Sequence, residues 1–430
     1  MGPPAVAAPP GAILAAPYRR LTVGTVLVVS FVAFEAMAVA TVLPVVVHHL
    51  GGIALYGWVF SAFTLAQVGG IVLAGRLVDR AGMARPFVAA AALFALGLLI
   101  DGAAPSMGVL VAGRVVQGVG GGIVAVVVNV AVGRGYPPAL RPRAYAALSA
   151  AWVLPALVGP PVAGTVATGV GWRMVFLALV PAVGLGAIVA LPPLASAGPV
   201  SAPSPRQRAG APGTRVAAAV AATASLAFFG TEAFVPLALT SLHHASAALA
   251  GSVLTGSALT WAVGSLAQAR WHERLGSRVL AAAGMALVAL GIAGAASVLS
   301  TATPWPVAYA AWGAAGAGMG LAYPTASLVV LASAGDRHGG PVAAMQVLVT
   351  LGVALGTGTG AGALAWSVTH GHGRVLGMAI TDAAMLVAAI AGLALCASMP
   401  GRAGSTGGSP GPQDLTRRPE HVSDPRAAAC

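Results

Sequence analysis

The sequence is poor in charge. Only 7% of its 430 residues are charged, with 10 acidic and 22 basic side chains, and none of the basic ones is lysine. So few charges cannot solvate the surface of a large water-soluble domain, which argues against a soluble enzyme. The arginines are spread through the loops without interleaved aromatic residues, so the net charge of +12 does not indicate nucleic-acid binding.

Cysteine is also scarce. The chain has two, Cys396 and Cys430, which are too few for a disulfide framework. Cys396 falls in an apolar run and Cys430 ends a polar tail, so we expect no bond between them. We also expect no cofactor and no metal site.

Long apolar runs are abundant, since 58% of the residues are apolar. About twelve runs of roughly 20 to 27 residues are separated by short breaks, and each can cross a hydrocarbon core of about 30 Å. The sequence therefore predicts an all-α integral membrane protein. The expected transmembrane helices lie near residues 21–45, 55–76, 86–105, 107–133, 144–168, 174–194, 216–241, 248–270, 279–300, 306–333, 341–368 and 375–398.

The breaks divide these helices into two sets of six. A segment rich in Pro, Gly and Ser separates the sets and is expected to be a linker, and the C-terminal segment has the same composition and is expected to be disordered. The predicted parts are an N-terminal tail (1–18), a first six-helix bundle (19–194), the linker (195–215), a second six-helix bundle (216–399) and a C-terminal tail (400–430).

The arginines predict the orientation of the helices. With both termini inside, 19 of the 22 arginines fall in cytoplasmic segments, Arg173 and Arg374 fall outside, and Arg114 lies near or within a run. Positive residues favour the cytoplasmic side of a membrane. We therefore expect a multi-pass protein of the plasma (inner) membrane, with both termini and the linker in the cytoplasm. Arg19 and Arg20, just before the first run, favour an uncleaved signal-anchor helix.

An internal repeat supports the division into halves. GRLVDRAG at residues 75–82 and ARWHERLG at residues 269–276 align at an offset of 194, with Arg, acid, Arg and Gly in register. Two similar halves that run in parallel are typical of transporters, whose binding site lies between the halves.

The loop after the second run carries the first of four notable patterns, GRLVDRAGMAR, residues 75–85. Glycine suits a tight turn, and Asp79 at a helix end can pair with arginines or with the positive end of a neighbouring helix. Such a contact can lock a cytoplasmic gate. The alternative is a solvated ion pair in a loop whose arginines only set the topology.

The fourth run carries the second pattern, AGRVVQGVGGG, residues 112–122. An arginine in hydrocarbon is costly unless it is paired or hydrated, so Arg114 should face the interior of the bundle. Gln117 lies one turn further on the same face and can relay hydrogen bonds. The alternative is an arginine that extends its side chain to the outer membrane surface.

The fifth run carries the third pattern, LPALVGPPVAG, residues 154–164. Gly159 and Pro160, followed by Gly164, should bend the helix and allow a neighbouring helix to approach closely. The alternative is a proline kink that has no part in coupling.

The fourth pattern is FEAMAVATVLP, residues 34–44, in the first run. Glu35 lies about 20 Å from the cytoplasmic start of its helix, where low polarity disfavours the charged carboxylate and allows a proton to load and leave. The alternative is a permanently neutral acid, hydrogen-bonded to a neighbouring helix.

Glu232 and Asp382 are further acids inside runs; either can recognise a cationic substrate or carry a second proton. Paired histidines, which suit pH sensing or polar capping, end two of the runs: His48-His49 and His243-His244.

On these four patterns the chain resembles the major facilitator superfamily, and within it the proton-coupled drug antiporters, over roughly residues 19–399. Glu35 takes the place of the family's usual Asp. Two departures weaken the match: Met83 and Ala84 stand before Arg85 where the family has basic residues, and Pro155 replaces the leading Gly of the third pattern.

The resemblance implies a fold of two pseudo-symmetric six-helix bundles that rock between two states, and export of small lipophilic or cationic compounds in exchange for protons. A uniporter or proton symporter for a small nutrient is an alternative, and a non-transporting sensor or assembly partner a remote one. The expected partners are a small-molecule substrate, protons and the bilayer, with no nucleic acid, and the protein is expected to act as a monomer.

The resemblance also implies a role for three groups of residues. These are Glu35, Arg114 and Gln117 for proton coupling; Gly75, Asp79, Arg80, Gly82 and Arg85 for gating; and Gly159, Pro160 and Gly164 for antiport.

Overall fold

The computed structural model describes residues 12–137, 140–196, 212–333 and 339–400. Most of the predicted linker and of both tails lies outside these ranges. Within them, every regular element is a helix, as the apolar runs predict. The first bundle holds α1 (Ala16–Leu50), α2 (Trp58–Ala81), α3 (Ala84–Ala103), α4 (Met107–Gly135), α5 (Arg141–Ala150), α6 (Val153–Val166), α7 (Arg173–Leu177) and α8 (Leu179–Ser196). The second holds α9 (Pro212–Glu232), α10 (Val235–Leu242), α11 (Ala247–Ser297), α12 (Val307–Ser333), α13 (Gly339–Thr369) and α14 (Gly373–Cys396).

The predicted runs coincide with these helices. Three runs are interrupted: α5 and α6 make up one crossing, α7 and α8 another, and α9 and α10 a third. The runs 248–270 and 279–300 are joined in α11, which has 51 residues and is too long for a single crossing. Eleven segments of the described chain are long and apolar enough to cross a membrane, and α11 supplies two crossings because it bends at Gly276.

The repeat seen in the sequence recurs in the backbone. Gly82 ends α2 with φ 73°, and Gly276, its counterpart 194 residues later, bends α11 with φ 76°. A side chain is strained at such angles, whereas glycine adopts them freely. The two halves therefore turn at equivalent glycines, which explains why Gly closes both copies of the repeated segment.

Glycines in α4 allow three helices to pack closely. A Cβ at Gly118 or Gly122 would collide with the backbone of α2 at Phe63 and Gln67, and one at Gly120 would collide with α3 at Ala90. Small residues permit this approach, and in lipid the close packing itself stabilises the helix pair. In the second bundle, glycines of α12 meet the backbone of α11 in the same way, at Gly316, Gly318 and Gly320.

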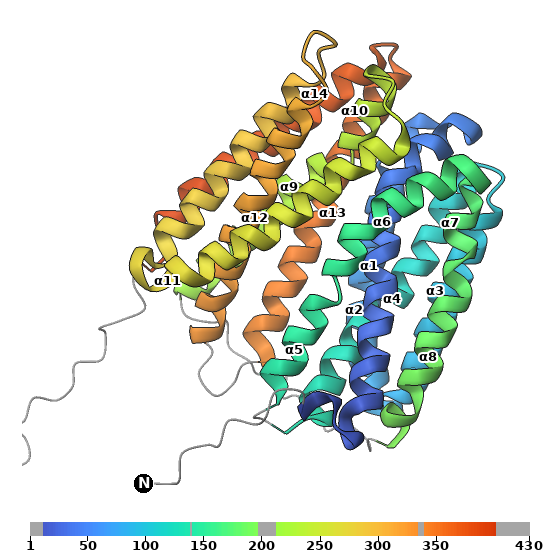
Figure 1. Cartoon of the computed structure of the whole chain (residues 1–430), viewed down its shortest axis with the longest axis vertical. Helices are drawn as coiled ribbons and strands as arrows, with labels where there is room; N and C mark the ends of the chain where they lie inside the picture. The colour runs from blue at the N-terminus through green and yellow to red at the C-terminus, as the bar shows by residue number, and fades with distance from the viewer. Residues whose placement is uncertain (1–11, 138–139, 197–211, 334–338, 401–430) are drawn as a thin grey trace, which may run out of the picture.

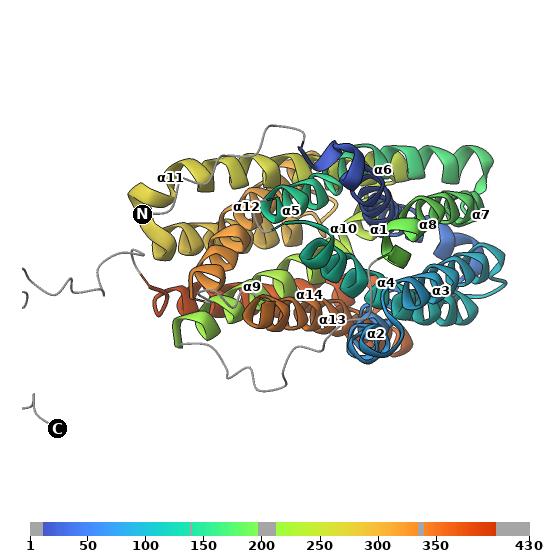
Figure 2. The ribbon, with the colours of Figure 1, turned by 90° about the horizontal axis from the view of Figure 1, so that it is seen from below.

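The two bundles meet at one end and diverge toward the other (Figures 1 and 2). We call the end that carries Gly51 and Gly57 the closed end, and the end that carries Ala16 and Arg141 the open end. At the closed end, the hydroxyl of Tyr56 donates to the carbonyl of Ala233, 3.0 Å away.

A second cross-bundle hydrogen bond links α2 to α13. The hydroxyl of Ser61 donates to that of Thr357 over 3.1 Å, and both side chains are buried. Just above it, the backbone of α13 at Ala361 leaves no space for a side chain at Gly57. These contacts lie within a buried apolar cluster that the two bundles share at the closed end, where the ring of Tyr56 lies 5.5 Å from that of Phe234. Apolar packing and two hydrogen bonds therefore seal this end.

Candidate functional site

A charged cluster lies inside the first bundle, where α1, α2 and α4 meet. The guanidinium of Arg114 on α4 forms an ion pair with the carboxylate of Glu35 on α1 and donates to the side-chain oxygen of Gln117. Arg114 is 2% exposed and Glu35 is 1% exposed. The structure thus brings together the three residues assigned to proton coupling, and Arg114 does not extend to the membrane surface.

Two contacts with α2 hold Arg114 in place. Its Nε donates to the carbonyl of Val59 over 3.1 Å, and its guanidinium lies 4.2 Å from the ring centroid of Phe63. Arg114 therefore joins three helices through its planar, multi-donor head, a geometry that lysine cannot reproduce. A change in the charge of Glu35 would alter how these helices are held together.

A fourth member of the cluster, Asp101, was missed by the sequence analysis. It lies on α3 with no exposed surface, and it interacts electrostatically with both Arg114 and Glu35. Neither of its carboxylate oxygens has a hydrogen-bond partner among the described residues. The available signal was an acid inside the predicted run 86–105, without any matching pattern around it.

The third sequence pattern lies on α6, at the contact between the bundles. Gly164 packs against the backbone of α11 at Ala248, and Pro160 faces Gly251 of the same helix. Gly159 lies against α1, because a Cβ there would be 3.5 Å from that of Met37. The small residues of this pattern therefore let α6 approach both α1 of its own bundle and α11 of the other.

The residues assigned to gating lie at the open end, around the end of α2. Gly82 ends the helix, and its N–H donates to the carbonyl of Val78 over 3.1 Å. Gly75 has open space where a side chain would be, and Arg80 and Arg85 are exposed. The side chain of Asp79 lies outside the described features, so its role in a latch stays a prediction.

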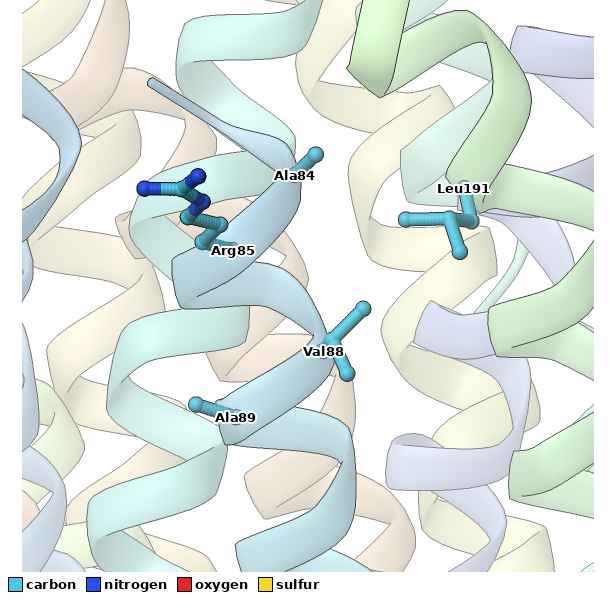
Figure 3. Close-up of a pocket in the computed structure, with 5 residues that line it drawn as sticks. All are labelled: Ala84, Arg85, Val88, Ala89 and Leu191. Atoms are coloured by element: carbon cyan, nitrogen blue, oxygen red, sulfur yellow. The ribbon is translucent and has the colours of Figure 1, made fainter. Parts of the chain in front are cut away.

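A shallow groove of about 400 Å³ lies between α3 and α8 (Figure 3). Its lining is apolar, from Ala84, Val88, Ala89 and Leu191, and the side chain of Arg85 points away from Leu191. The groove sits at the start of α3, whereas Asp101 lies near the end of that helix. It is therefore separate from the charged cluster.

The two acids of the second bundle remain apart from this cluster. Glu232 ends α9 and Asp382 lies in α14, exposed by 7% and 6%. Among the described residues, no ion pair joins either acid to Arg114. Glu232 does lie next to the closed end, because the residue after it, Ala233, accepts the hydrogen bond of Tyr56.

The paired histidines cap helix ends. His49 bonds through Nδ1 to the carbonyl of Val45 over 2.8 Å, at the end of α1. His243 bonds through Nε2 to the carbonyl of Val298 over 2.7 Å and so links the end of α10 to the end of α11. The carbonyl of Val298 lies just beyond the end of α11, where helix carbonyls lack an intrahelical donor, so the bond from His243 satisfies it.

Comparisons with known proteins agree with the fold and the patterns. Residues 25–357 match the Major Facilitator Superfamily. An Acurin A biosynthesis cluster MFS-type transporter of Aspergillus aculeatus is 34% identical over 154 residues, 35% of this chain and 27% of that protein. The multidrug transporter protein MdtP of Bacillus subtilis is 27% identical over 169 residues, 39% of this chain and 31% of that protein. The chain thus spans about a third or less of the length of these relatives.

Solved structures with the same fold cover nearly the whole chain. A bacterial homolog of the human lysosomal transporter Spinster, inward-facing and occupied, matches 90% of this chain and 97% of its own with a TM-score of 0.70 and 16% identity. A D-xylose–proton symporter matches 89% and 97% with a TM-score of 0.66 and 16% identity. Such low identity shows the fold alone. With the family match over residues 25–357, the chain belongs to the Major Facilitator Superfamily and is a membrane transporter.

Proposed function

We propose that this transporter exports small lipophilic or cationic compounds in exchange for protons. The observation that carries the proposal is the buried ion pair between Glu35 and Arg114, with Gln117 beside it. A buried pair holds only while both members are charged, since neutralising one leaves the other without compensation. Protonation of Glu35 would release Arg114 and loosen the junction of α1, α2 and α4, which couples a proton to the shape of the bundle.

A group of aromatic rings in the second bundle supports the substrate class. Phe229 of α9, Trp261 of α11 and Tyr323 of α12 are half-buried and lie close together, with Trp261 5.6 Å from the ring of the buried Phe228 and 6.3 Å from that of Tyr323. Aromatic faces attract cations and also bind apolar surface. This ring cluster suits a lipophilic cation better than a sugar.

The orientation of the helices determines which side of the membrane each end faces. With both termini cytoplasmic, the open end faces the cytoplasm and the closed end faces outward, so the structure corresponds to an inward-facing state of an alternating-access cycle. In the outward-facing state, the gating segment at residues 75–85 would hold the cytoplasmic side shut. Several relatives are named multidrug or efflux transporters, which supports export as the direction.

Proton movement in liposomes tests the proposal. The purified protein is reconstituted with a pH-sensitive dye inside the vesicles, and a lipophilic cation such as ethidium is added outside. An antiporter moves protons out of the vesicles as the cation enters. Proton entry together with the cation would indicate a symporter. Cation uptake without proton movement would indicate a uniporter and overturn the coupling.

The cytoplasmic position of the linker can be checked by labelling. A single cysteine at Ser204, in a chain carrying Cys396→Ala and Cys430→Ala, should resist a membrane-impermeant thiol reagent added to intact cells and react once the membrane is permeabilised. A cysteine in place of the exposed His48, at the closed end, serves as the outward-facing control and should react in intact cells. Labelling at Ser204 from outside would reverse the orientation.

A cross-link at the closed end should stop transport. Ser61→Cys with Thr357→Cys replaces two hydroxyls that lie 3.1 Å apart on the two bundles. Because these bundles must separate there for the outward-facing state to form, oxidation should abolish transport and a reducing agent should restore it. Each single cysteine variant, oxidised in the same way, is the control. Full transport by the cross-linked protein would show that this contact does not open during the cycle.

A further inference from the structure

Asp101 is a buried acid whose carboxyl has no hydrogen-bond partner among the described residues. Arg114, the nearby cation, is already paired with Glu35. Asp101 lies on α3, on the face that packs against α4: a Cβ at Gly97 would collide with Gln117, and one turn further a Cβ at Gly113 would collide with the carboxyl of Asp101. Gly113 directly precedes Arg114. Asp101 therefore lies against α4 at the residue next to Arg114, and it interacts electrostatically with that arginine.

The charge balance of the cluster determines whether the Asp101 carboxyl is protonated. The cluster contains two carboxyls, Glu35 and Asp101, and one cation, Arg114, all with 2% exposure or less. An ionised carboxyl in apolar surroundings is costly unless it is paired, and Arg114 is already bonded to Glu35, Gln117 and the carbonyl of Val59. With Glu35 ionised, Asp101 is neutral and carries a proton in this conformation.

The other groups around Asp101 do not change this balance. Helix α7 packs on the same end of α3, but Arg173 donates to the carbonyl of Ala104 over 3.1 Å and lies 4.3 Å from the ring of Trp172. Helix α8 has no ionisable side chain. The ionisable residues of α2 come near its far end, at positions 76–80. Tyr56, which precedes α2, bonds to the other bundle.

We propose that Asp101 is the second carboxyl of the proton site and that the transported proton passes between Asp101 and Glu35 as Arg114 changes partner. The inference rests on the proposed proton-coupled function. In the step, the Asp101 carboxylic acid gives its proton to the Glu35 carboxylate, which yields an Asp101 carboxylate and a Glu35 carboxylic acid with no change in total charge. Arg114 then pairs with Asp101, so its side chain is bonded to α3 and no longer to α1.

The positions of the two acids give the relay a direction. Asp101 is two residues from the end of α3 at the closed end, whereas Glu35 lies in the middle of α1. A proton from outside would reach Asp101 first, when the closed end opens, and would leave from Glu35 toward the open end. Neither carboxyl alone would connect the two sides of the membrane.

The test is the split between uphill and downhill transport in Asp101→Asn, measured in proteoliposomes with ethidium as the probe. Asn imitates the neutral acid of this conformation but cannot release a proton. Accumulation of ethidium driven by a pH gradient of one unit should fall by about tenfold, because one proton exchanged per cycle sustains about that accumulation ratio. Downhill ethidium exchange should stay within about twofold of wild type, and Asp101→Glu should recover part of the uphill mode. A merely structural defect would lower both modes together.

The outcomes separate this inference from the proposed function. If wild type accumulates ethidium with the pH gradient and Asp101→Asn does so equally well, Asp101 carries no transported proton and the inference is overturned, while the proposed function stands. If wild type shows no proton-driven accumulation, both fall.

A second variant keeps the test open should Asp101→Asn fail to fold. Gly113→Ala places a methyl group against the Asp101 carboxyl and displaces it from its present position, whereas Gly133→Ala, on the same helix, meets open space. Gly113→Ala should lower uphill accumulation selectively and Gly133→Ala should not. Equal coupling in the two variants would overturn the inference.

Discussion

Replacing Arg114 by methionine should abolish transport and lower the stability of the transporter. Methionine has a similar length but no charge, so Glu35 loses the cation of its ion pair, and the carbonyl of Val59 loses its donor. Removing one member of a buried ion pair costs about 3–5 kcal/mol because the remaining charge is left uncompensated. Thermal unfolding in detergent and ethidium transport in proteoliposomes measure the two effects.

Three further variants test whether loss of the ion pair causes the loss of transport and of stability. Val115→Met changes the next residue of α4, which is 43% exposed, and should leave both properties close to wild type. Arg114→Lys keeps the charge but cannot bond Glu35 and Val59 together, so partial activity is expected. Glu35→Gln combined with Arg114→Met removes both charges and should regain stability over Arg114→Met alone without regaining transport. Transport by Arg114→Met at the wild-type rate would contradict a role for the ion pair.

The fold could be predicted from the sequence because membranes limit the choices. Uninterrupted apolar runs must be helices in lipid, since no water satisfies their backbone groups, and the positions of the helices follow from hydropathy alone. The interruptions in the fifth, sixth and seventh runs, and the continuity of α11 through Gly276, could not be predicted. They depend on local backbone angles and on packing between helices.

The site could be predicted only in part. The cost of burying an arginine predicted that Arg114 would face inward, and the resemblance to drug antiporters pointed to Glu35 as its counterpart; the structure places the two together. Asp101 was missed because its significance comes from Gly113 and Arg114, which lie on another helix. A contact between helices leaves no mark in the sequence of either one, so an acid outside any known pattern could not be assigned.

A large effect on coupling is expected from Glu35→Gln. Glutamine keeps the size of the side chain and an oxygen that can accept from Arg114, but it can neither release nor accept a proton. The variant should therefore bind ethidium with near wild-type affinity and lose accumulation against its gradient. With one proton exchanged per cycle, a pH gradient of one unit sustains about tenfold accumulation, and that factor should disappear.

Downhill exchange of ethidium should survive in Glu35→Gln, because it needs the bundles to rock but needs no proton to be carried. Glu273→Gln, which changes an exposed acid of α11, is the matched control and should transport as wild type does. Glu232→Gln should be milder than Glu35→Gln, since no cation holds Glu232 among the described residues. If Glu35→Gln accumulates ethidium at the wild-type level, Glu35 is a structural acid, and the transported proton must instead be carried by another buried acid, with Glu232 and Asp382 of the second bundle next to be tested.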